Sequence, residues 1–140
     1  MIAYFDTSAL IKLIIPEEGS QLASKAWEAA DTRVTSRVTY PEARAALGAA
    51  SRAGRLTRNS QRLAKRSLEH RVAQTIIIEL SGDLARLAGD AAERFALRGF
   101  DAIHLVSAFA IEADDPVIVT WDEAQTAAAQ AAGLRVLTGS

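Results

Sequence analysis

The sequence contains no cysteine, and this absence limits both its covalent chemistry and its metal chemistry. Without thiols, the chain can form neither a disulfide bond nor a thiolate-held metal site. It also has only two histidines in 140 residues, so a bound metal ion would be held mainly by oxygen atoms. Chains without disulfides are typical of reducing compartments, and we therefore expect a cytoplasmic protein.

Long apolar runs are also missing. No stretch approaches the roughly 20 apolar residues that span a bilayer, so we expect no membrane association. The first residues carry no basic cluster, and Asp6 and Lys12 interrupt their apolar run, which argues against a signal peptide. No repeat, linker or low-complexity block divides the chain. This organisation predicts a single domain over residues 1–140 with a substantial core.

The net charge is only −1, but the positive charges are distributed unevenly. Residues 52–71 hold seven of the sixteen lysines and arginines, against the single acid Glu69. One face of the helix predicted there carries Arg58, Arg62, Lys65 and Arg66. A solvated helix normally intersperses acids among its bases, so the imbalance favours contact with the phosphates of a nucleic acid. The same face would also suit an acidic segment of a protein partner.

Short apolar segments alternate with longer amphipathic ones along the chain. Near-continuous apolar or β-branched runs predict strands at residues 2–5, 32–36, 75–80, 117–120 and 134–137. Helical periodicity and capping residues predict helices at residues 20–30, 41–54, 57–73, 82–99, 101–113 and 122–133. This alternation is typical of an α/β protein with a mainly parallel sheet of five strands.

Four acids occupy positions near the carboxyl ends of these predicted strands. Asp6 and Asp122 each follow a strand, Glu42 lies at the start of a helix after a strand, and Asp101 begins an apolar helix. Each has a local explanation, because acids are favoured at helix N-caps. The stretch "TYPE" fits a capping box with Thr39 as the cap, and Asp122 precedes Gln125 by three residues.

Capping does not require four acids at one edge of one sheet. Two unit charges 4 Å apart repel by about 4 kcal/mol at an effective dielectric constant of 20, so a cluster needs protons or a cation. Oxygen ligands favour Mg²⁺, with Mn²⁺ as a substitute. Such an ion activates water and screens a phosphate, so the sequence predicts metal-assisted hydrolysis of phosphodiesters.

Several motifs, in order and spacing, resemble the PIN-domain family, and in particular its VapC-like toxins. They are "FDTSALIKL", the helix that holds Glu42, "DAIHLVSA" and "VTWDEAQTAAAQAAGLRVL". The resemblance implies a PIN-like three-layer α/β/α sandwich. It also implies a Mg²⁺-dependent endoribonuclease toxin that inhibits translation, is often a homodimer, and is neutralised by a cognate antitoxin.

The resemblance also implies roles for individual residues. Asp6, Glu42, Asp101 and Asp122 match the catalytic acids of the family. Asp6 and Asp101 are the expected direct metal ligands, and Asp122 completes the metal site either through water or at a second metal position, as does Glu42. Ser8 and Thr120 match the supporting hydroxyls. His104 lies one helical turn after Asp101 on an apolar helix, and we interpret it as a hydrogen-bonded structural histidine.

Other classes of function fit the sequence less well. The chain has neither a glycine-rich phosphate loop nor a G-x-S-x-G motif, which disfavours nucleotide binding and serine-hydrolase chemistry. The remaining alternative is a catalytically silent PIN scaffold that only binds RNA or a protein partner. Metal-dependent cleavage by the purified protein separates the two.

Overall fold

The computed structural model describes residues 1–113 and 115–139, and within them five strands and seven helices. The strands are β1 (Ile2–Phe5), β2 (Thr32–Ser36), β3 (Ile76–Ile78), β4 (Val117–Val119) and β5 (Arg135–Leu137). The helices are α1 (Thr7–Ile14), α2 (Ser20–Ala29), α3 (Thr39–Arg52), α4 (Arg58–Ala73), α5 (Gly82–Phe95), α6 (Gly99–Phe109) and α7 (Glu123–Ala131). None of these helices is long and apolar enough to cross a membrane.

The strands form one sheet in the order β3-β2-β1-β4-β5, and each pairing is parallel. This confirms the predicted α/β class and parallel sheet. β1 lies in the middle, where Tyr4 pairs with Val34 of β2 and Ile118 of β4. The chain builds from β1 out to β3 and then returns to the other side of β1, so the topology switches between β1 and β4. Ligands of open parallel sheets bind beyond the carboxyl ends of the strands at such a point.

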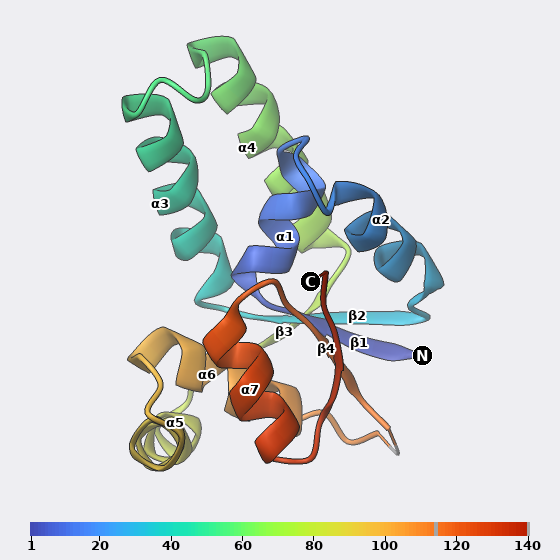
Figure 1. The fold of residues 1–140 in the computed structure, drawn as a ribbon, viewed down its shortest axis with the longest axis vertical. Coiled ribbons are helices and arrows are strands. Elements are labelled where there is room, and N and C mark those ends of the chain that lie inside the picture. The colour runs from blue at the N-terminus through green and yellow to red at the C-terminus, as the bar shows by residue number, and fades with distance from the viewer. Residues whose placement is uncertain (114, 140) are drawn as a thin grey trace.

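Helices cover both faces of the sheet, so the predicted three-layer arrangement is confirmed (Figure 1). Helices α1 to α4 lie on one face, where Phe5 of β1 packs in a buried cluster with Trp27 of α2. Helices α5, α6 and α7 lie on the other face, where Tyr4 shares a cluster with Leu105 of α6. Because side chains alternate along a strand, neighbouring residues of β1 anchor opposite layers.

Helices α3 and α4 form a hairpin that extends away from the sheet (Figure 1). A separate buried cluster holds this hairpin to α1 through Ile14, Leu47 and Leu68. Glu42 lies in the first turn of α3 and the basic residues of the 52–71 segment lie mainly along α4. The hairpin therefore joins one of the predicted catalytic acids to the predicted phosphate-binding face.

Two helical segments differ from the expectation drawn from the sequence. Residues 7–14 form α1, where the sequence predicted no element. The helix predicted at 82–99 is shorter than expected, because Ala96 adopts a left-handed conformation with φ of 53° and ends α5 at Phe95. A new helix, α6, then begins at Gly99 rather than at Asp101. This break allows α5 and α6 to pack against each other.

The strand predicted at residues 75–80 is shorter than expected and lies at the edge of the sheet. β3 comprises Ile76–Ile78, and Ile76 is 57% exposed. A continuous apolar run favours a strand that is buried on both faces, but it does not specify the position of that strand in the sheet. The apolar side chains of β3 are therefore only partly covered.

Candidate active site

Asp6 is a buried carboxylate at the carboxyl end of the central strand, and it is 4% exposed. It caps α1, because its Oδ1 accepts the Ala9 backbone N–H at 3.0 Å. Oδ1 also accepts the Ser8 hydroxyl at 2.6 Å, and Oδ2 accepts the Thr120 hydroxyl at 2.5 Å. The cap predicted for Asp6 is therefore present. The two predicted supporting hydroxyls contact this carboxylate directly.

The environment of Asp6 raises its pKa above the usual value for an aspartate. Burial is the main cause, because it removes the carboxylate from water and disfavours its charged form. The nearby His104 and the donors from Ser8, Thr120 and Ala9 lower the pKa and offset part of this effect. The buried charge of Asp6 is only partly compensated by the protein.

Asp122 and Asp101 lie on the other side of the switch point. Asp122 caps α7, as predicted, because its Oδ1 accepts the Gln125 N–H at 2.8 Å. Asp101 does not cap α6, because that helix begins two residues earlier and its N-cap is Arg98. Arg98 Nε instead donates to Asp101 Oδ2 at 3.0 Å, and its Nη2 lies 3.8 Å from Asp122 Oδ2. An exposed guanidinium thus links the two carboxylates.

Glu42 does not take part in the capping box predicted for "TYPE". The N-cap of α3 is Val38, and the Thr39 hydroxyl contacts that of Thr35 at 2.7 Å. Glu42 Oε1 instead accepts the Thr7 hydroxyl at 2.7 Å and lies 2.6 Å from His104 Nε2. The capping interpretation was wrong because Glu42 points toward α1 and α6 rather than back along its own helix.

The pKa of Glu42 lies below the usual value for a glutamate. Burial alone would raise this pKa, but the hydrogen bond and charge of His104, the Thr7 hydroxyl and the charge of Arg98 together outweigh it. Glu42 is therefore a carboxylate at neutral pH, whereas Asp6 resists ionisation. The two acids have different environments although both face the same region.

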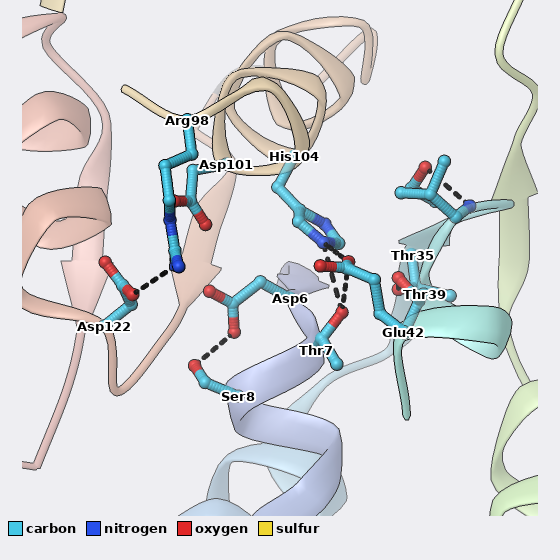
Figure 2. Close-up of polar contacts among 12 residues, drawn as sticks. Asp6, Thr7, Ser8, Thr35, Thr39, Glu42, Arg98, Asp101, His104 and Asp122 are labelled. Carbon is cyan, nitrogen blue, oxygen red and sulfur yellow. Dashed lines mark hydrogen bonds and ion pairs between the residues drawn. The ribbon is translucent and has the colours of Figure 1, made fainter. Parts of the chain in front are cut away.

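Figure 2 shows how the four acids are arranged around the end of the sheet. Asp6 lies between the group of Asp101, Arg98 and Asp122 on one side and the pair of Glu42 and His104 on the other. A groove of about 400 Å³ opens beside them and is lined by Glu42, Arg98, Gly99, Phe100, Asp101 and Ile103. The sequence predicted the acids, but it gave no indication of the contacts made by Arg98 and Thr7.

The donor set of this site fits a hard divalent cation. The side chains are carboxylates and hydroxyls, and burial disfavours the charged form of the Asp6 carboxylate more than its neighbours favour it. The Arg98 guanidinium supplies positive charge between Asp101 and Asp122, at the place where a cation is needed. Within residues 1–113 and 115–139, no group of three or more His, Asp or Glu side chains is already close enough to hold an ion. Binding would therefore require these side chains to move together.

The predicted phosphate-binding face lies on the exposed surface of the α3–α4 hairpin. Arg58, Arg62, Lys65 and Arg66 are all exposed. A groove of about 310 Å³ between the helices is lined by Arg44, Leu47, Arg58, Gln61, Arg62 and Lys65. Arg66 does not line this groove, whereas Arg44 of α3, which the sequence pattern did not single out, does. Helix packing thus extends the basic face from one helix to two.

The fold and site define an α/β protein with acidic residues gathered at the switch point of a parallel sheet. Residues 3–131 match the family model of the PIN domain. Ribonuclease VapC45 of Mycobacterium tuberculosis (strain CDC 1551 / Oshkosh) is 44% identical over 135 residues, which is 96% of this chain and 94% of that protein. The chain therefore belongs to the PIN-domain family, and it is VapC-like over nearly its whole length.

Solved structures share the fold at lower sequence identity. PAE2754 from Pyrobaculum aerophilum has a TM-score of 0.73 and 21% identity, covering 97% of this chain and 83% of that one. A structure of VapBC2 from Rickettsia felis, bound to a DNA fragment from its promoter, has a TM-score of 0.67 and 13% identity, and it covers 100% of both chains. At these identities, the likeness establishes the common fold.

The raised pKa of Asp6 predicts a pH-dependent effect of Asp6→Asn on the metal-free protein. Native Asp6 favours the protonated form, so its contribution to stability is present below the unfolded pKa, about 3.9, and is lost as the pH rises through the folded pKa. The neutral asparagine avoids this loss. In urea unfolding with EDTA, the stability of the variant relative to wild type should therefore improve from pH 4 to pH 7, by about 1.4 kcal/mol per unit of pKa shift. An unchanged difference at the two pH values would contradict this explanation.

Proposed function

We propose that this protein is a Mg²⁺-dependent endoribonuclease toxin that cleaves RNA and thereby inhibits translation. The observation that carries the proposal is the arrangement of Asp6, Glu42, Asp101 and Asp122 around one end of the sheet, beside an open groove. The similarity to a protein named as a ribonuclease supports the same conclusion. Mn²⁺ is the expected substitute ion, because it shares the preference of Mg²⁺ for oxygen ligands.

In this proposal, Asp6, Asp101 and Asp122 hold the metal ion. When bound, the ion neutralises the carboxylates, screens the phosphate and lowers the pKa of water. Ser8 and Thr120 keep the Asp6 carboxylate in one orientation through their hydroxyl donors. Arg98 is 82% exposed at its side chain, so it is free to leave the two acids and contact the RNA.

Glu42 acts as the base of the site. It is ionised at neutral pH, lines the groove and is partly exposed, so it is placed to accept a proton from a water molecule there. Asp6 is unsuited to this role because it is buried, and because three protein donors leave about one of its four lone-pair sites, which the ion would take. The environments of the two acids therefore support separate roles.

A cognate antitoxin is the proposed protein partner, and the active form is proposed to be a cytoplasmic homodimer. The partner is supported by the shared fold with a structure named as a toxin–antitoxin complex from Klebsiella pneumoniae, which has a TM-score of 0.62 and 22% identity. The basic groove of the α3–α4 hairpin is assigned to RNA rather than to the antitoxin, because exposed cations from both helices line it and Lys and Arg contacts to phosphates dominate nucleic-acid affinity.

The catalytic assignment is tested by Asp101→Asn and Asp122→Asn. Each should lower the rate of RNA cleavage by about 10²–10³-fold, the loss typical when a charge-stabilising group is removed from a transition state. Asparagine still caps helices well, so α7 and the fold should be retained. The assay incubates purified protein with total bacterial RNA in Mg²⁺ or EDTA and sequences the new RNA ends.

The matched control for this assay is Glu123→Gln, which removes the exposed acid next to Asp122. It should cleave at the wild-type rate. A wild-type protein that binds RNA but cleaves none in Mg²⁺ or Mn²⁺ would instead identify a silent PIN scaffold. Equal losses of cleavage rate for Glu123→Gln and Asp122→Asn would show that the loss comes from removing a negative charge in this region, not from Asp122 itself.

The basic face is tested by replacing Arg58, Arg62 and Lys65 together with glutamine. Each lost phosphate contact should lower the slope of log K against log salt by about 0.7 for single-stranded RNA, giving a total of about 2. Binding is measured with the inactive Asp101→Asn protein across a salt series. The control replaces three exposed cations elsewhere, namely Lys25, Arg86 and Arg94. An unchanged slope with loss of antitoxin binding would reassign this face to the protein partner.

A further inference from the structure

His104 is a buried side chain that makes polar contacts in addition to packing in the core. It is 2% exposed on α6, and both of its ring nitrogens contact polar side chains. Nδ1 lies 2.6 Å from the Tyr4 hydroxyl. Nε2 lies 2.6 Å from Glu42 Oε1, and Figure 2 shows this contact. The predicted hydrogen-bonded histidine is therefore present, and it has a charged partner that the sequence did not show.

We propose that His104 is a positioning residue that fixes the orientation of the Glu42 carboxylate and acts on the reaction only through Glu42. This inference rests on the proposed function, because it concerns the same site. It assigns a specific role to a side chain that does not itself reach the groove.

The donor role of His104 Nε2 follows from its partner, because hydrogens are assigned from the hydrogen-bond network. Glu42 is ionised at neutral pH, so its Oε1 only accepts, and the proton between them belongs to His104 Nε2. The Tyr4 hydroxyl contacts Nδ1 on the opposite side of the ring, and because Tyr4 is fully buried on β1, it holds the ring in place.

The second donor to Glu42 comes from α1. Thr7 Oγ1 donates to the same Oε1 atom at 2.7 Å and lies 3.1 Å from His104 Nε2. In the part of the chain that the structure describes, both recorded contacts of the Glu42 carboxylate thus use one oxygen. Oε2 is left for the groove that Glu42 lines. Because both donors contact Oε1, they orient the carboxylate and leave the lone pairs of Oε2 available.

The network also joins three elements that carry the site. Thr7 is adjacent to Asp6 at the start of α1, Glu42 lies in α3, and His104 lies one turn after Asp101 in α6. A glutamate side chain has three rotatable bonds, and it loses this freedom only when its end is held. Hydrogen-bond partners that orient the groups of a metal site typically affect activity or metal affinity by 10–100-fold.

Two substitutions of His104 separate positioning from packing. The amide nitrogen of glutamine takes the place of Nε2, so His104→Gln keeps a donor toward Glu42. The amide of asparagine takes the place of Nδ1, so His104→Asn keeps the contact with Tyr4 and loses that donor. Both remove the ring and should lower the melting temperature similarly. We expect His104→Asn to lower the cleavage rate by about 10–100-fold and His104→Gln to remain within a few-fold of wild type.

A double-mutant cycle with Glu42→Gln tests whether His104 acts through Glu42. The rates of single-turnover cleavage are compared for wild type, each single variant and the double variant, on an RNA oligonucleotide taken from a site that wild type cleaves. His104→Asn should cause no further loss once Glu42 is replaced. Tyr4→Phe, which keeps both rings and removes the hydroxyl, should show a smaller loss with the same dependence on Glu42, and it carries the test if His104→Asn does not fold.

The outcomes separate this inference from the proposed function. Multiplicative losses in the cycle, or equal rates for His104→Asn and His104→Gln, would overturn the positioning role while wild-type cleavage upholds the function. Absence of both cleavage and Mn²⁺ binding in the wild type would overturn the function and the positioning role together. Mn²⁺ binding is measured by electron paramagnetic resonance of the free ion.

Discussion

The buried carboxylate of Asp6 is the constraint on which the rest of the site depends. It lies at the end of the central strand, at the point between β1 and β4 where the topology of the sheet switches. Hydroxyl and amide donors from Ser8, Thr120 and Ala9 hold it in place, but they do not restore its ordinary pKa. A buried charge that is oriented but not neutralised is suited to binding a cation.

The negative charges of the remaining acids around Asp6 are balanced to different degrees. Arg98 contacts Asp101 and Asp122, and it is exposed enough to be exchanged for another cation. Glu42 is compensated from within the protein, through His104 and Thr7. On the side of Asp101 and Asp122, the charge balance thus depends on an exposed, replaceable cation. On the side of Glu42, buried side chains fix the geometry. This division fits the separate tasks that we propose, namely holding a metal ion and accepting a proton.

The sequence predicted the parts of the site that follow from strand topology. Asp6 and Asp122 come directly after strands, and parallel strands bring their carboxyl ends to one edge. The capping interpretations of Glu42 and Asp101 were wrong, because the cap depends on the residue at which each helix begins. The contact of His104 with Glu42 spans 62 residues, and that of Tyr4 with His104 spans 100, so no local pattern records them. The edge position of β3 and the groove formed with Arg44 likewise depend on packing between elements.

The most direct test of this account is thermal unfolding of the metal-free protein during a Mn²⁺ titration, with Asp6→Asn as the comparison. An ion that binds only the native state stabilises it by about 2.7 kcal/mol at 100 times the dissociation constant. If Asp6 holds the ion, the melting temperature should rise with Mn²⁺ over micromolar to millimolar concentrations in wild type and hardly change in Asp6→Asn. Equal shifts in the two proteins, or no shift in wild type, would contradict a metal site built around Asp6.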